Sequence, residues 1–264
     1  MNEVDRRFAA RRRLWDEALT GLSLEGKSVL DAGTGEGHFT RYLAESAPGR
    51  LVSVTCLEEE VPPARARVAE LADRVEFTLA DVTAMTQIPD ASFDVVGADY
   101  LIAAVAAYSP YREIDCLKEL KRVLRPGGRL VVTGWEVSPL RRSRAEAHFR
   151  ELFRLREAIN LLAGIEPFRE HPRRWVEDRL VDLGMPPERH HEVPDVHHDI
   201  GWYIEGCRRK LSLLDCPDLR EVLGRQVDDV AGHLEGDPSF VGGFEFGRLY
   251  AVVACKLDGA LLLG

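Results

Sequence analysis

The sequence predicts an α/β protein built on a mostly parallel β-sheet with helices on both faces. Between residues 28 and 135, short runs rich in β-branched and apolar residues alternate with segments whose apolar residues recur every three to four positions. This alternation is typical of right-handed β-α-β units, whose crossover helices cover both faces of a parallel sheet. The predicted strands are "SVLDAG", "RLVSVTCLE", "RVEFTLAD", "FDVVGADYLI" and "GRLVVTGWE".

Helical patterns fill the intervals and both flanks of this region. Residues 1–25 form an amphipathic helix that either packs on the sheet or lies over a ligand as a lid. After residue 136 long helical patterns return, and "RHHEVPDV" reads as an edge strand because Pro194 is excluded from a central one. We expect one domain over residues 1–264, made of a binding core (26–135), two helical insertions after the fifth and sixth strands (136–188 and 197–244) that cover a substrate, and a last strand (245–257).

Composition excludes several functional classes. The net charge of −9 disfavours a large nucleic-acid footprint, because phosphate backbones are bound mainly through cations. Five cysteines without a C-x-x-C pair indicate a reducing compartment. No apolar stretch approaches the roughly 20 residues of a membrane span, and the first residues lack the apolar region of a signal peptide. We therefore expect a cytoplasmic protein without a membrane span.

The loop after the first predicted strand indicates the ligand. Its glycines, Gly33, Gly35 and Gly37, recur at every second position, so His38 occupies the place of the third glycine in a dinucleotide fingerprint. Asp31 at the strand end would repel a pyrophosphate but attract a cation. S-adenosylmethionine carries a sulfonium and an ammonium group and no phosphate, so it fits this loop. The alternative is a tight turn with no ligand.

Two further carboxylates follow the next strands. Glu58, which we expect at the end of the second strand, can accept hydrogen bonds from ribose hydroxyls, because adjacent parallel strands bring their carboxyl ends to one crevice. Asp81 ends the third strand, where it either accepts from an adenine amino group or caps the following turn.

Five segments resemble, in order, the motifs of class I S-adenosylmethionine-dependent methyltransferases. They are "VLDAGTGEGHFT", "LVSVTCLE", "LADV", "FDVVGADYLI" and "LKRVLRPGGRLVVT", and together they cover roughly residues 26–135. These segments are most similar to the motifs of the quinone-biosynthesis and small-molecule branch of that family. The resemblance implies a Rossmann-like sheet of seven strands, with the last strand antiparallel beside the fifth and the sixth strand at the edge.

The resemblance also implies roles for individual residues. The glycine loop would line the methionine part of the cofactor, the Val82 N–H would serve adenine N1, and Asp99 and Tyr100 would lie beside the sulfonium and the substrate. Alternatively, Asp99 accepts backbone hydrogen bonds and Tyr100 is a packed aromatic. The implied cofactor-binding set is Asp31, Ala32, Gly33, Thr34, Gly35, Gly37, Glu58, Glu59, Asp81, Val82, Asp99 and Tyr100.

Methyl transfer from a sulfonium is an in-line displacement, so the protein needs no covalent nucleophile. A base is required only where the acceptor loses a proton, and the candidates are His38, Asp99 and Tyr108, with His190 or His191 as further alternatives. The group "RHHEVPDVHHD" invites a metal hypothesis. Successive side chains on a strand point to opposite faces, however, so at most half of these histidines converge and we expect no metal.

We expect the acceptor to be a small molecule methylated on O, N or C. The chain lacks the Asn/Asp-Pro-Pro-aromatic segment typical of nucleic-acid amino-methylation after the fourth strand, which disfavours nucleic acid. The alternatives are an RNA or protein methyltransferase and a non-catalytic S-adenosylmethionine-binding protein. The sequence leaves open whether the protein forms a homodimer.

Overall fold

The computed structural model describes residues 3–137, 143–240 and 243–257. Residues 138–142 and 241–242, which belong to the two predicted insertions, lie outside the described part. The strands form one seven-stranded sheet in the order β3-β2-β1-β4-β5-β7-β6, as the resemblance implied. The strands are β1 (Ser28–Ala32), β2 (Arg50–Thr55), β3 (Val75–Leu79), β4 (Phe93–Asp99), β5 (Leu124–Val137), β6 (Pro187–His197) and β7 (Phe244–Cys255).

The helices that accompany β1 to β5 follow the predicted alternation. The structure adds one helix, α4 (Leu101–Tyr108), directly after the fourth strand. The fourth predicted strand extended to Ile102, but β4 ends at Asp99 and α4 begins at Leu101, because Tyr100 adopts a left-handed φ of 54° that ends the strand. The helices are α1 (Glu3–Leu19), α2 (His38–Glu45), α3 (Val61–Arg67), α4 (Leu101–Tyr108) and α5 (Glu113–Val123), with short 3-10 turns η1 (Glu58–Glu60) and η2 (Ala69–Arg74).

The strand order reverses at β1. The chain proceeds outward from β1 through β2 to β3 and then returns to place β4 on the other side of β1. Asp31 lies in register with Ser53 of β2 and with Gly97 of β4. In sheets of this kind ligands bind outside the carboxyl ends of the strands at such a reversal. The fold therefore places the ends of β1, β2 and β4 at a site of this type.

The far side of the sheet also agrees with the prediction. β7 lies between β5 and β6 and is antiparallel, and β6, which contains Pro194, forms the edge. At one end the N–H of Gly127 donates to the Lys256 carbonyl, and the N–H of Lys256 donates to the Gly128 carbonyl. Because Pro194 cannot donate a ladder hydrogen bond, the edge is where a strand tolerates it.

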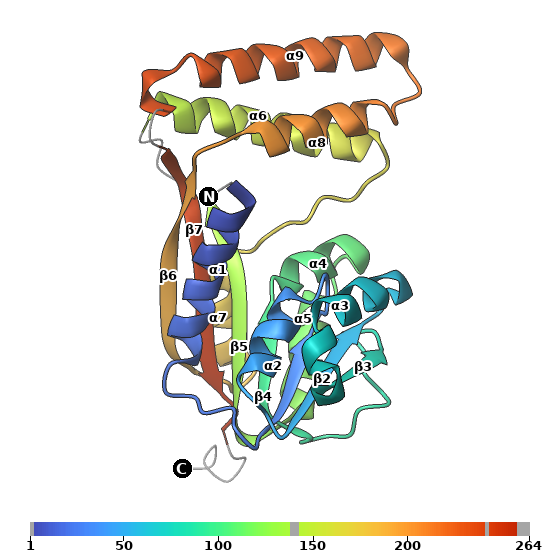
Figure 1. The fold of residues 1–264 in the computed structure, drawn as a ribbon, viewed down its shortest axis with the longest axis vertical. Helices are drawn as coiled ribbons and strands as arrows, with labels where there is room; N and C mark the ends of the chain where they lie inside the picture. The colour runs from blue at the N-terminus through green and yellow to red at the C-terminus, as the bar shows by residue number, and fades with distance from the viewer. Residues whose placement is uncertain (1–2, 138–142, 241–242, 258–264) are drawn as a thin grey trace. The chain divides into compact units, whose positions relative to one another are not determined.

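The chain divides into two compact units. One comprises residues 1–12, 137–168 and 193–249, and the other residues 13–136, 169–192 and 250–264. In the first unit, α6 (Arg144–Leu162), α8 (Gly201–Leu211) and α9 (Pro217–Glu235) pack side by side (Figure 1), and a 3-10 turn, η3 (Pro238–Phe240), follows them. None of the helices described combines the length and apolarity needed to cross a bilayer.

Helix α7 (Arg173–Asp182) belongs to the second unit, although we expected it in a helical insertion that covers a substrate. Its residues Val176 and Leu180 are fully buried in the hydrophobic core together with Leu117 of α5 and Val252 of β7. Helix α7 is therefore part of the layer that covers the sheet.

Leu180→Ala is expected to lower the free energy of unfolding by about 2–5 kcal/mol, because it leaves a cavity in this core. Val181→Ala is the matched control, since Val181 is adjacent on the same helix and 57% exposed. It should change stability by no more than about 0.5 kcal/mol. Urea denaturation followed by tryptophan fluorescence measures both, and equal effects would contradict the packing of α7.

Candidate functional site

Asp31 is buried at the end of β1, with no cationic partner among the described residues. Its Oδ2 accepts hydrogen bonds from the Thr40 hydroxyl (2.5 Å) and the Ser53 hydroxyl (3.1 Å). Its Oδ1 is buried as well and has no hydrogen-bond partner among the described residues. Burial, with a smaller contribution from the Asp99 carboxylate, raises the pKa of Asp31 from 3.8 to about 7, against the effect of the two hydroxyls. A buried carboxylate with one oxygen lacking a partner among the described residues would be stabilised by a cationic ligand.

Two hydroxyl groups, those of Thr40 and Ser53, hold this carboxylate, and that of Thr34 contacts Ser53; we did not predict any of the three in this role. The Ser53 hydroxyl lies 2.8 Å from that of Thr34 and 3.1 Å from that of Thr40, and all three residues are buried. Thr34 was in the predicted set only as part of the loop. Ser53 is the one hydroxyl inside the apolar run "LVSV", which is the signal that could have identified it.

The glycine loop approaches its neighbours too closely for side chains. Gly33, Gly35 and Gly37 all have positive φ angles, of 99°, 47° and 80°. A Cβ at Gly37 would lie 2.8 Å from the Ala64 Cα, whereas one at Gly35 would meet nothing within 4 Å. The N–H groups of Gly33 and Thr34 both donate to the Val54 carbonyl. The loop is thereby held against β2 and α3, while space remains open at Gly35.

Asp99 at the end of β4 is held by two donors. Its Oδ1 accepts from the Trp15 indole N–H (2.8 Å) and from the Thr133 hydroxyl (2.6 Å). The Tyr100 N–H in turn donates to the Thr133 hydroxyl oxygen (3.2 Å). Trp15 is 1% exposed and its ring centroid lies 5.1 Å from that of Phe39. Trp15 thus packs against α2 and donates to Asp99, and the role of the N-terminal helix as a lid over a ligand stays a prediction.

Asp81 caps a turn with one of its two oxygens. Its Oδ1 accepts from both the N–H (2.8 Å) and the hydroxyl (2.7 Å) of Thr83, and its Oδ2 lies 3.7 Å from the Arg112 guanidinium. The capping alternative is therefore correct for Oδ1. Contact of Asp81 and of the half-buried Val82 with adenine stays a prediction.

The carboxylates after β2 differ in position from the prediction. The strand ends at Thr55, so Glu58 is in the short turn η1 rather than at the strand end, and both Glu58 and Glu59 are exposed. The neighbouring Glu60, which we did not predict, accepts a hydrogen bond from the Thr55 hydroxyl (2.6 Å). A carboxylate is thus fixed at the end of β2, but it is that of Glu60.

The candidate bases lie on different elements. His38 begins α2, and its Nε2 lies 3.4 Å from a Glu36 carboxylate oxygen. Tyr108 ends α4 and is 56% exposed, and partial burial and the carboxylate of Glu60 raise its pKa. A raised pKa disfavours the phenolate, so Tyr108 is a poor base at neutral pH. The catalytic assignment of His38 stays a prediction.

The histidines along β6 alternate between faces, as the strand pattern predicts. His190 Nδ1 lies 3.2 Å from the Glu177 carboxylate, and His191 Nδ1 lies 3.9 Å from that of Glu17. His197 is fully buried, with Nε2 2.9 Å from an Asp195 carboxylate oxygen. Within the described ranges no group of three or more His, Cys, Asp or Glu side chains converges in a way that could hold a metal ion.

These features together fit a cationic, phosphate-free cofactor. Asp31 has a buried carboxylate oxygen without a hydrogen-bond partner among the described residues, the loop leaves space at Gly35, and Asp99 supplies a second carboxylate at the adjacent strand end. Repulsion between the Asp31 and Asp99 carboxylates contributes to the raised pKa of Asp31, and a cation between them would relieve it.

Part of this chain is similar in sequence to known proteins. Residues 30–132 match the family model described as a methyltransferase domain. The chain is 33% identical over 134 residues to the ubiquinone/menaquinone biosynthesis C-methyltransferase UbiE of Cereibacter sphaeroides, a match that covers 48% of this chain and 50% of that protein. It is 29% identical over 187 residues to the 27-O-demethylrifamycin SV methyltransferase of Amycolatopsis mediterranei, covering 70% of this chain and 63% of that protein. The chain thus spans about half the length of the quinone methyltransferase.

The fold is shared over a longer stretch than the sequence similarity. The structure of a 1,6-didemethyltoxoflavin-N1-methyltransferase from Burkholderia thailandensis, solved with bound 1,6-didemethyltoxoflavin and S-adenosylhomocysteine, superposes with a TM-score of 0.57. The match covers 97% of this chain and 82% of that one at 19% identity. At this identity the likeness establishes the fold alone.

Asp31→Asn is expected to change how stability depends on pH. The folded protein retains the Asp31 proton up to about pH 7, whereas the unfolded chain releases it near 3.8, so stability falls as the pH rises through that window. The slope from this group approaches about 1.4 kcal/mol per pH unit. The ligand-free variant should therefore gain stability relative to the unsubstituted protein between about pH 5 and pH 7. Chemical denaturation at several pH values measures this difference, and a difference that does not vary with pH would contradict the buried carboxylate.

Gly37→Ala is expected to destabilise the protein by about 2 kcal/mol or more, because a left-handed φ and a contact with the Ala64 backbone oppose the new methyl group. Gly232→Ala is the control, since Gly232 lies inside α9 with nothing within 4 Å of the added atom. That change should stabilise the protein by up to about 1 kcal/mol. Thermal unfolding compares the two, and a neutral Gly37→Ala would show that the loop can relax.

Proposed function

We propose that the protein is an S-adenosylmethionine-dependent methyltransferase that acts on a small molecule, since residues 30–132 match the methyltransferase domain model. The observation that carries the proposal is the buried Asp31 carboxylate, whose Oδ1 has no hydrogen-bond partner among the described residues. Pairing with the ammonium group of the cofactor would satisfy this oxygen and stabilise the charged form of Asp31.

The remaining cofactor contacts follow the crevice. We assign the methionine part to the glycine loop and the ribose hydroxyls to the carboxylates after β2, where Glu60 joins the predicted Glu58 and Glu59. The Thr55 hydroxyl orients Glu60, which supports its inclusion. We assign the recognition of adenine to Asp81 Oδ2 and to the Val82 N–H.

The bound cofactor would supply a methyl group already activated on a sulfonium. The protein then has to orient the acceptor and exclude water, which can contribute about 7–11 kcal/mol. Asp99 suits an orienting role, because Trp15 and Thr133 hold its carboxylate in one position. Where the acceptor must lose a proton, His38 is the better of the predicted bases, since Tyr108 is exposed and its pKa is raised.

A small acceptor is favoured over a macromolecule. The net charge of −9 opposes binding to nucleic acid. The relatives named above act on a quinone precursor and a rifamycin, and the structural neighbour acts on a toxoflavin precursor, all of them small molecules. All five cysteines are free thiols, which is consistent with the cytoplasm as the compartment we propose.

Transfer of labelled methyl groups from S-adenosylmethionine tests this function. The protein is incubated with cell extract, which is then separated into small-molecule, RNA and protein pools. We expect label in the small-molecule pool. Asp31→Ala should weaken cofactor binding in calorimetry by about 1–3 kcal/mol, or roughly 5- to 150-fold, and should remove the label.

The other outcomes separate the alternatives. Label only in RNA or protein would identify a macromolecular methyltransferase, and tight cofactor binding with no label in any pool would identify a non-catalytic binding protein. Thr20→Ala serves as the control substitution, because Thr20 is exposed just after α1 and its hydroxyl donates to the Asp16 carbonyl, away from Asp31. Unchanged cofactor affinity in a folded Asp31→Ala protein would refute the site assignment.

A further inference from the structure

The hydrogen bonds of the Asp31 side chain to described residues all involve hydroxyl groups, which can serve either protonation state of a carboxyl group. Thr40 and Ser53 contact its Oδ2, and the Ser53 hydroxyl in turn lies 3.1 Å from that of Thr40 and 2.8 Å from that of Thr34. A hydroxyl has one donor and two acceptor positions, whereas guanidinium, ammonium and backbone N–H groups only donate. The cluster can therefore donate to an ionised Asp31, or accept from a protonated one, by rotation of hydroxyl hydrogens alone.

The position of Asp31 favours its protonated state when no cation is bound. The residue is fully buried, and its Oδ1 has no hydrogen-bond partner in the described part of the chain. The Asp99 carboxylate acts on it with a charge of the same sign. Burial without a cation and repulsion by a like charge both favour the neutral carboxyl group, in agreement with the raised Asp31 pKa of about 7.

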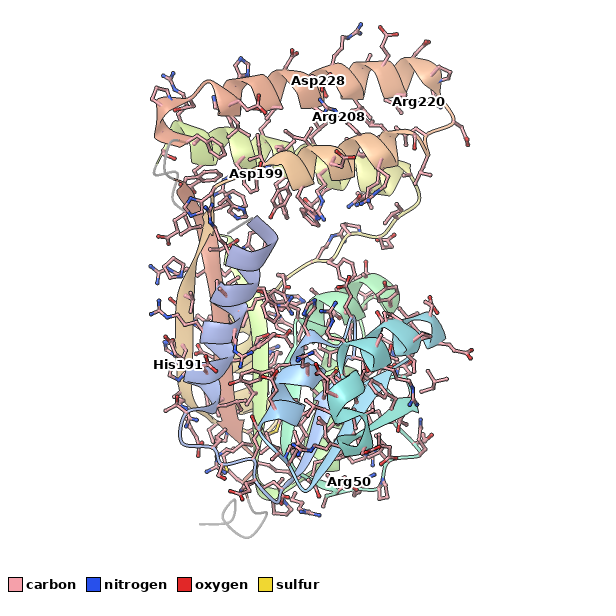
Figure 2. The ribbon with its side chains drawn as sticks, in the orientation of Figure 1. Arg50, His191, Asp199, Arg208, Arg220 and Asp228 are labelled. Carbon is pink, nitrogen blue, oxygen red and sulfur yellow. The ribbon has the colours of Figure 1, made fainter. Side chains whose placement is uncertain are left out.

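The other titratable groups of the glycine loop, α2, β2 and β4 pair with residues other than Asp31. On β2, Arg50 is in register with Ser28, at the start of the strand (Figure 2), and donates to Glu76 (2.9 Å). Imidazole is the side chain that ordinarily titrates near neutral pH, so an experiment has to separate His38 from Asp31. The remaining pairs are His38 with Glu36 (3.4 Å), Arg41 with Glu45 (3.1 Å), Tyr42 with Asp16 (2.9 Å) and Asp94 with Arg125 (2.7 Å).

The cofactor of the proposed function requires the ionised form of Asp31, because its ammonium group needs an acceptor oxygen. We propose that this site is gated by a proton: binding of the ammonium group is coupled to release of a proton from Asp31 to the solvent. The O–H bond of the carboxyl group breaks, its electron pair stays on the carboxylate, and the carboxylate then pairs with the ammonium. The inference rests on the proposed function and adds a regulation of the same site.

This coupling fixes the direction in which cofactor affinity depends on pH. Below about pH 7 the proton must be removed before the ammonium can pair, so affinity falls by up to about tenfold for each unit of acidification. Above that pH Asp31 is already ionised and affinity reaches a plateau. Free α-amino groups titrate at about 7.7–8.0, so the ligand itself stays mostly protonated up to about pH 7.5.

Calorimetric titration of the full chain with S-adenosylhomocysteine, which carries the same ammonium group, tests the proposal. We expect binding to be about tenfold weaker at about pH 5.5 than at about pH 7.5. At about pH 6 the heat of binding should differ between phosphate and imidazole buffers, whose enthalpies of ionisation differ, by the amount expected for release of close to one proton. 5′-Methylthioadenosine lacks the ammonium group, so its binding should release no proton and should not vary with pH.

Asp31→Asn removes the proton that is released. Its affinity for S-adenosylhomocysteine should be lower than that of the unsubstituted protein at the higher pH and should be the same at both pH values. Asp73→Asn is the matched control, because it removes the same kind of carboxylate at an exposed position. That variant should retain the full pH dependence. Circular dichroism and thermal unfolding establish that each variant is folded.

Thr40→Val tests the coupling without removing Asp31. It deletes a hydroxyl that lies 2.5 Å from Oδ2 and changes the shape of the side chain little. This hydroxyl lowers the pKa of Asp31, so its loss should move the fall in affinity to higher pH. The result is informative even where Asp31→Asn binds no ligand. His38→Gln should leave the pH dependence of binding in place.

Three results would overturn the inference: equal affinity for S-adenosylhomocysteine at the two pH values, no proton release on binding, or a pH dependence that is lost in His38→Gln and kept in Asp31→Asn. Binding that does not vary with pH refutes the proton gate and leaves the proposed function intact. No binding of S-adenosylhomocysteine at any pH refutes the proposed function and the gate with it.

Discussion

The candidate site depends on a carboxyl group that is buried among hydroxyl groups. Asp31 is fully buried, and in the described part of the chain its Oδ2 accepts from the hydroxyls of Thr40 and Ser53. Hydroxyls satisfy one oxygen and leave the other, so the protein carries an electrostatic cost that a cationic ligand can remove. The buried carboxylate lowers the stability of the ligand-free protein at the position where it would raise affinity for a cationic ligand, which is a common compromise at functional sites.

The surrounding fold maintains this arrangement by close packing. Thr34, Thr40 and Ser53 come from the loop, from α2 and from β2, so the hydroxyl cluster forms only when all three elements are in place. On the opposite side of β1, Gly97 of β4 leaves room for the Phe39 ring, since a Cβ there would lie 2.4 Å from it. Phe39 in turn contacts Trp15, whose N–H holds Asp99. Packing therefore couples the two carboxylates of the crevice to the N-terminal helix.

The sequence by itself determined the arrangement of the sheet and the presence of a glycine-rich loop after its first strand. Strand and helix periods are local properties, and Pro194 and the alternate glycines report backbone requirements directly, so the edge position of β6 and the class of fold could be predicted. Tertiary structure decided the partners of the site. The local sequence pattern could not show that β4 ends at Asp99 because Tyr100 is left-handed, or that β2 ends at Thr55, whose hydroxyl holds Glu60. Nor could it show that Ser53 and Thr40 both contact Asp31. The direction of a side chain after a turn depends on the φ and ψ angles of the turn, and the partners of a buried charge come from residues distant in sequence. Those quantities exist only once the chain has folded.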